Sequence, residues 1–230
     1  AKFYVDQDVW ESDVARYGID IWMTTNAITQ NFKICQSNLG VKIHDAKDPA
    51  EHLGPMFRQV VWTIFSLMER FESYWKGIHG SEPVETFGFG GTVEPEPVKI
   101  DLEGMIQHFK IGFQQFSSLW KEIFYEECFS EIQETAQKES KSFSLATATW
   151  VRILYELAAT FHSWKVNRNK LIDLVTPLYY ARVASFARES WEMSSQDAEL
   201  LVEKQALEFE EGKNYLLKIW DEKTTPSSST

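Results

Sequence analysis

The chain has 230 residues, of which 43% are hydrophobic and 14% aromatic, so it has ample material for a core and global disorder is excluded. Against 34 aspartates and glutamates stand 23 lysines and arginines, a net charge of −11 that repels duplex nucleic acid and anionic membrane surfaces. No apolar run reaches the roughly 20 residues needed to cross a bilayer.

The N-terminal region contains one predicted helix and two predicted strands. Apolar residues follow Gly18 and predict a helix from about Gly18 to Asn31. Alternating character predicts a short strand at residues 32–36, and a second at 41–44 after the turn signal Asn38-Leu39-Gly40. The two cysteines are far apart and in no metal-type spacing, so reduced thiols in a cytoplasmic protein are expected.

A strong helix start follows at Asp48 and Pro49, because aspartate caps free amide groups and proline suits the first helical position. One face of this long helix is apolar at steps of three and four, at Met56, Val60, Ile64, Leu67, Phe71 and Tyr74. Residues 80–100 are rich in glycine and proline, which predicts a linker or long loop.

Residues 101–220 are predicted to form an antiparallel helical bundle, so the chain is expected to be mainly α. Asp101 is predicted to cap a helix whose apolar stripe comprises Leu102, Ile106, Phe109, Phe113, Phe116, Trp120 and Ile123. A third helix carries a similar stripe from Trp150 to Trp164, and a fourth runs from Leu171 to Ala181 with a kink or restart at Pro177. A last helix is predicted from about residue 197 to 220, and a disordered tail at 221–230.

Two short segments carry residues suited to chemistry. Asp20 lies between large apolar residues at a helix start, where the helix dipole stabilises a negative charge; a plain first-turn carboxylate is the alternative. Lys42 and His44 would share one face of a short strand, with Lys47 close behind. Imidazole and ammonium groups together suit an anion or a metal-bound diphosphate, whereas an ordinary surface or core histidine is the alternative.

Three blocks in this region stand in a recognisable order and spacing. They are Gly18-Ile19-Asp20-Ile21, Gln36-Ser37-Asn38-Leu39-Gly40-Val41-Lys42-Ile43-His44 and Gly54-Pro55-Met56-Phe57-Arg58-Gln59-Val60. Together they resemble the end of the GT-A catalytic domain in glucosyl-3-phosphoglycerate synthases and the related glucosylglycerate and mannosylglycerate synthases. The resemblance covers residues 17–62 and is loose or absent beyond about residue 100.

The resemblance implies an organisation for the whole chain. Residues 1–79 would be the C-terminal edge of a GT-A α/β domain with its long helix, followed by a linker at 80–100, the bundle at 101–220 and the tail at 221–230. The nucleotide-binding half would lie N-terminal to this chain, which begins at Ala1 without an initiator methionine. We therefore expect a fragment that is inactive alone.

The resemblance also implies site residues. His44 matches the histidine that completes the coordination of a divalent metal, Mg or Mn, at the donor diphosphate. Asp20 matches a catalytic glutamate but is one methylene shorter, and Lys42 matches an arginine beside the acceptor. Asp45 departs from the family pattern and would repel a phosphorylated acceptor, for which Lys47 partly compensates as a second acceptor-binding residue.

Other motifs are interpreted as structural. Asp6-Gln7-Asp8 has the form of an Asp-x-Asp metal motif, but in GT-A enzymes that motif lies far upstream of the block at 18–21, so a capping turn is expected here. The glycine-rich run at 88–91 lacks the strand, helix and lysine of a phosphate loop. The remaining histidines have no partners at metal-ligand spacing.

The resemblance implies transfer of a hexose from a nucleoside-diphosphate sugar to a small acidic acceptor, such as glycerate or 3-phosphoglycerate, with retention of the anomeric configuration. The enzyme is expected to be a cytoplasmic homo-oligomer with neither nucleic acid nor membrane as partner. The alternative is a non-enzymatic helical interaction or oligomerisation module that pairs with a partner helix through the stripe from Phe109 to Trp120.

Overall fold

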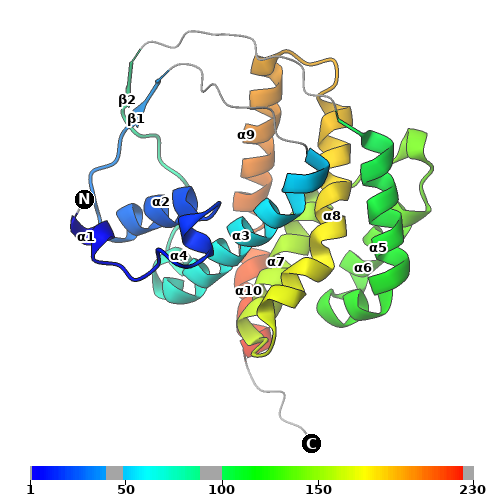
Figure 1. Cartoon of the computed structure of the whole chain (residues 1–230), viewed down its shortest axis with the longest axis horizontal. Helices are drawn as coiled ribbons and strands as arrows, with labels where there is room; N and C mark the ends of the chain where they lie inside the picture. The colour runs from blue at the N-terminus through cyan, green and yellow to red at the C-terminus, as the bar shows by residue number, and fades with distance from the viewer. Residues whose placement is uncertain (1, 40–48, 89–99, 225–230) are drawn as a thin grey trace, which may run out of the picture. The chain divides into compact units, whose positions relative to one another are not determined.

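The computed structural model describes residues 2–39, 49–88 and 100–224. The chain divides into two compact units, residues 1–99 and 100–230. Helices make up most of both units (Figure 1), which confirms the predicted mainly α class. Sheet structure in the described residues is limited to one pair of two-residue strands.

The first unit contains short helices around one long one. Its elements are α1 (Lys2–Val5), the 3-10 helix η1 (Asp13–Ala15), α2 (Ile19–Thr29), β1 (Gln36–Ser37), α3 (Pro49–Arg70), α4 (Glu72–Lys76) and β2 (Thr86–Phe87). The strands pair in parallel, with Gln36 opposite Thr86 and Ser37 opposite Phe87. The helix predicted from about Gly18 to Asn31 is confirmed, and α3 begins at the predicted proline.

The strand predicted at residues 32–36 is wrong except at its last residue. Asn31 ends α2 with a positive φ of 54°, and the Phe32 amide donates back to the Ala27 carbonyl at 2.9 Å. The Phe32 ring then packs edge-on against Phe3, with ring centroids 5.8 Å apart. Because Phe32 closes the end of the helix, alternation along this segment does not describe a strand. The second predicted strand, at 41–44, lies outside the described residues.

A small aromatic core holds the first unit together. Val14, Trp22 and Leu67 are buried, and Tyr4, Val9, Ile19, Ile21 and Phe71 pack around them. The Tyr4 and Trp10 rings meet the Trp22 indole edge-on, with centroids 5.5 and 5.9 Å away. This core therefore joins α2, η1 and the C-terminal end of α3, the elements that carry the first and third sequence blocks.

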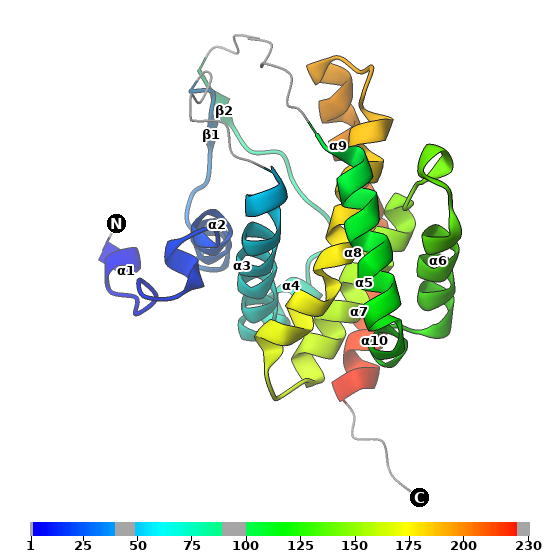
Figure 2. The same cartoon turned by 45° about the vertical axis from the view of Figure 1, so that its right-hand side comes forward.

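The second unit is entirely helical in its described part. Its elements are α5 (Leu102–Ile123), α6 (Glu126–Gln137), the 3-10 helix η2 (Ser140–Ser142), α7 (Thr147–Ser163), α8 (Arg168–Glu189), α9 (Ser195–Glu211) and α10 (Lys213–Thr224). The predicted cap of α5 is confirmed, because an Asp101 carboxylate oxygen accepts the Gly104 amide at 2.9 Å. Helices α5 and α8 lie side by side (Figure 1 and Figure 2).

Glycine permits the close approach of α5 to α8. A Cβ atom at Gly112 would lie 2.4 Å from two carbons of the Pro177 ring, well inside van der Waals contact. Helix α8 continues through Pro177, so of the predicted kink or restart the restart is excluded, and the proline ring packs against α5.

Two further predictions needed correction. Helix α6 was not predicted, although Cys128, Phe129 and Ile132 form its buried face. The single helix predicted at 197–220 is two helices, because α9 ends at Glu211, Gly212 follows as its C-cap, and α10 begins at Lys213. The break separates α9, which has no buried side chain, from α10, which buries Leu216, Ile219 and Trp220.

Candidate functional site

Only one of the four predicted site residues falls in the described part of the chain. Asp20 lies in the first turn of α2 and is exposed. Lys42, His44 and Lys47 all lie at residues 40–48, outside the described residues. Of the predicted site, the structure therefore describes the Asp20 carboxylate and the helices that hold it.

The N-terminus of α2 places the Asp20 carboxylate in a favourable field. Free backbone N–H groups in the first turn give the end of a helix a partial positive charge, which stabilises a nearby anion. The N-cap residue, Gly18, has no side chain to occupy these groups. Asp20 is the acidic residue of this first turn, and its side chain is open to solvent.

A glutamine from α3 holds the backbone that leads into this turn. The Tyr17 amide donates to the Gln59 side-chain oxygen at 3.3 Å, and Gln59 is only 4% exposed. Two residues of the turn, Ile19 and Ile21, pack around the buried Trp22. The structure thus fastens the residue that precedes the first sequence block to a residue of the third block, and the exposed Asp20 follows three residues later.

The other segments of interest near the N-terminus behave as structural elements. Asp6-Gln7-Asp8 lies in the turn that ends α1, where the Asp6 amide donates to the Lys2 carbonyl at 3.1 Å. No group of three or more His, Cys, Asp or Glu side chains is placed to hold a metal ion among residues 2–39, 49–88 and 100–224.

Sequence reasoning missed a buried acidic residue in the second unit. Glu156 of α7 is fully buried, and its two carboxylate oxygens accept the Tyr125 amide and the Tyr215 hydroxyl, each at 2.6 Å. Burial raises the pKa of this carboxyl, and the hydrogen bonds from Tyr215 and Tyr125 oppose that rise only in part. Its position between the buried Ile153 and Leu157 was the available signal, since an acid on a buried helix face needs partners.

The groups around Glu156 join α10 to the rest of the unit. The Lys223 ammonium donates to the Ile123 carbonyl at 2.8 Å and to the Thr160 hydroxyl. Burial, and then the charge of Glu156, raises the pKa of the Cys128 thiol, which keeps the thiol protonated and unreactive. The whole arrangement is a buried cross-link between helices.

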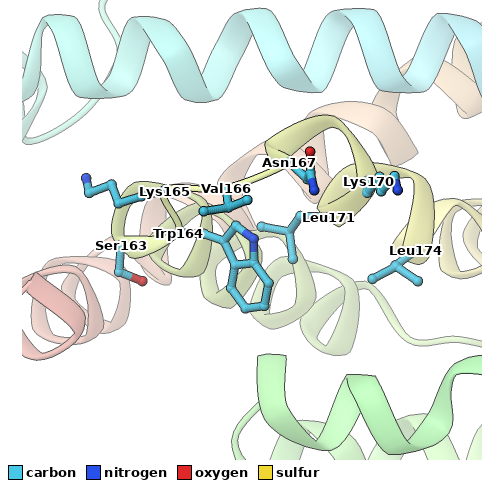
Figure 3. Close-up of a pocket in the computed structure, with 8 residues that line it drawn as sticks. All are labelled: Ser163, Trp164, Lys165, Val166, Asn167, Lys170, Leu171 and Leu174. Carbon is cyan, nitrogen blue, oxygen red and sulfur yellow. The ribbon is translucent and has the colours of Figure 1, made fainter.

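A hollow of about 600 Å³ lies at the turn between α7 and α8 (Figure 3). It is lined by Ser163, Trp164, Lys165, Val166, Asn167, Lys170, Leu171 and Leu174. In Figure 3 the Trp164 indole and the Leu171 side chain lie on the same side of the turn, whereas Lys165 points away. Lys165 donates to the His162 carbonyl at 2.9 Å. The polar groups of its lining are Ser163, Lys165, Asn167 and Lys170.

The stripe proposed to pair with a partner helix is not available for that role. Phe109 and Trp120 are both 0% exposed. The Phe109 ring contacts Phe143, with centroids 5.6 Å apart, and the Trp120 indole N–H donates to the Leu174 carbonyl at 3.0 Å. The stripe forms the core of the second unit, so this part of the alternative prediction is wrong.

Neither the helix lengths nor the comparisons with known proteins assign a function to the chain. In the described parts of the chain, each helix is too short or too polar to cross a bilayer. Comparison with family models, curated proteins and solved structures found no match.

Proposed function

We propose that this chain is the C-terminal part of a metal-dependent glycosyltransferase. It would move a hexose from a nucleoside-diphosphate sugar to a small acidic acceptor such as glycerate or 3-phosphoglycerate, with retention. The observation that supports this proposal most directly is the hydrogen bond from Tyr17 to Gln59. It fastens α3, which carries the third block, to the residue just before the first block, and Asp20, three residues further along the chain, is exposed.

Each site residue has a chemical role in this proposal. The Asp20 carboxylate orients the acceptor hydroxyl or stabilises positive charge that develops at the sugar carbon. Lys42 and Lys47 bind the carboxylate or phosphate of the acceptor, a local cationic exception in a chain of net charge −11. His44 would hold a divalent cation, Mg or Mn, whose bound form would neutralise the departing nucleoside diphosphate.

Hexose transfer by the complete polypeptide that contains this chain tests the proposal. We expect turnover that requires Mg or Mn, and a fall of roughly 10²-fold or more in His44→Ala with altered metal dependence. His79→Ala is the matched control, because His79 is an exposed histidine of the same unit. Unchanged activity and metal dependence in His44→Ala would refute the assigned role.

The catalytic role of Asp20 needs a separate pair of variants. Asp20→Asn keeps the shape of the side chain and removes its charge, so kcat should fall by roughly 10²-fold if the carboxylate stabilises the transition state. Asp20→Glu restores the length found in the synthases and should keep measurable activity. Equal activity in Asp20→Asn and the unchanged enzyme would mean that Asp20 has no catalytic role and is an ordinary carboxylate in the first turn of a helix.

A helical interaction module remains the second candidate function, and one observation favours it. No residue of helix α9 is fully buried, and Leu200 and Leu207, one heptad apart, are 56% and 57% exposed. Glu203 and Lys204 lie between these leucines on the same face of α9, so a partner helix that offers one basic and one acidic side chain there would fit it. Light scattering during a metal titration separates the candidates, because association that ignores metal, without turnover, favours the module.

A further inference from the structure

Gln59 has a position that its local sequence does not explain. It is a polar residue 4% exposed in the long helix α3, where an apolar side chain would be expected. Its side-chain oxygen accepts the amide of Tyr17, 42 residues earlier in the chain. Its backbone carbonyl accepts the Thr63 hydroxyl at 2.8 Å, which is an ordinary contact within the helix.

The backbone before α2 needs such an acceptor. A backbone N–H that is withdrawn from water needs an acceptor, and the contact of the Tyr17 N–H is partly buried. Gly18 is the N-cap of α2 and makes no side-chain hydrogen bond. The Gln59 oxygen accepts the N–H immediately before this cap, so it fixes the entry of the chain into the helix from a rigid neighbouring element.

We propose that Gln59 is a positioning residue for Asp20. It acts through the backbone: the tether at Tyr17 sets where the first turn of α2 lies against α3, and the Asp20 side chain extends from that turn. The catalytic consequence rests on the proposed glycosyltransferase function. The inference also gives a physical reason for the joint occurrence of the blocks at 18–21 and 54–60, since one supplies the carboxylate and the other the acceptor that locates it.

Three variants separate positioning from general stability. Gln59→Leu removes the acceptor at similar size, and Gln59→Glu keeps a side-chain oxygen that can accept the same N–H. Thr63→Val is the matched control, because Thr63 is a buried polar residue of α3 (1% exposed) whose hydroxyl bonds only within its own helix. Thermal unfolding of all three checks that each remains folded.

The first measurement is hydrogen exchange of the Tyr17 amide in the full chain. We expect exchange at least about tenfold faster in Gln59→Leu, near the original rate in Gln59→Glu, and unchanged in Thr63→Val. The second is turnover by the complete polypeptide. There, Gln59→Leu should lower kcat by up to roughly 10²-fold with little change in the donor KM, as expected for a displaced catalytic group, and Gln59→Glu should recover most of it.

Each outcome decides one part of the inference. An unchanged rate of hydrogen exchange at the Tyr17 amide in Gln59→Leu would show that Gln59 does not hold this backbone segment. Faster exchange with unchanged kcat overturns the positioning role while the transferase function stands. If the original polypeptide shows no hexose transfer, the proposed function fails and the catalytic consequence fails with it, whereas the exchange measurement still decides whether Gln59 holds the turn.

Discussion

Replacing Glu156 by alanine is expected to destabilise the second unit substantially. The carboxylate is fully buried and joins two other elements to α7. It accepts the Tyr125 amide at the start of α6 and the Tyr215 hydroxyl of α10, both at 2.6 Å. Alanine would leave both donors without their acceptor.

The magnitude follows from the two donors. A buried donor left unsatisfied costs about 1–3 kcal/mol, so two of them cost about 2–6 kcal/mol. Tyr125 and Tyr215 are partly exposed, so water replaces some of each lost bond, and the loss of a buried charge offsets a further part. We therefore expect a loss of about 2–4 kcal/mol in the free energy of unfolding, and a smaller loss for Glu156→Gln, whose amide keeps one accepting oxygen.

The pH dependence of this effect has a definite sign. Burial raises the pKa of Glu156 in the folded protein above the ordinary value of 4.5. The folded state therefore holds this proton more tightly than the unfolded state does, and the stabilisation is complete below about pH 4.5. It is lost as the pH rises through the folded pKa, so the advantage over Glu156→Gln should shrink above pH 4.5.

Chemical denaturation followed by far-UV circular dichroism measures both effects. Glu134→Ala is the control, because Glu134 is an exposed glutamate of α6, and its loss should change stability by no more than about 0.5 kcal/mol. A loss in Glu156→Ala no larger than in this control would refute the reasoning. So would a difference from Glu156→Gln that grows with pH.

Two other changes test the packing and the surface of the second unit. Gly112→Ala should lower the free energy of unfolding by about 1–3 kcal/mol, because its methyl group would collide with Pro177 at 2.4 Å. Gly77→Ala is the control and should be nearly neutral, because the closest atom that its methyl group would meet is 3.6 Å away. Equal losses of stability in the two variants in thermal unfolding would contradict the contact between Gly112 and Pro177. Leu200→Glu and Leu207→Glu should each change the free energy of unfolding by no more than about 0.5 kcal/mol, since both side chains are more than half exposed. Light scattering should show that either change weakens association with a partner. A large fall in melting temperature would instead mean that these leucines are packed within the protein.

The features that were predictable from sequence depend on neighbours within a few residues. The cap at Asp101 and the stripe through Ile106, Phe109 and Trp120 were readable, because capping and helical periodicity act over three or four positions. The failures have equally local causes. Phe32 alternates like a strand residue but closes a helix, and the apolar pattern across Gly212 did not reveal the break between α9 and α10.

For the candidate site, the sequence supplied the residue types and their order. It identified Asp20 as an acid at a helix start, which the structure confirms, and it proposed roles for Lys42, His44 and Lys47. It did not indicate that a glutamine in the third block would accept a backbone amide beside the first. Nor did it show which groups would satisfy an acid on the apolar face of α7, because Tyr125 and Tyr215 lie 31 and 59 residues away from Glu156.

By itself, therefore, the sequence determined that this protein is helical, where its clearest helices begin, and which acid opens α2. Only the tertiary structure decided which distant groups meet: Gln59 with Tyr17 across 42 residues, and Glu156 with Tyr215 across 59. The physical reason is range. Capping and periodicity are properties of adjacent turns, whereas a hydrogen bond between remote segments exists only after their helices have packed, and its energy depends on a distance and a burial that no local pattern encodes.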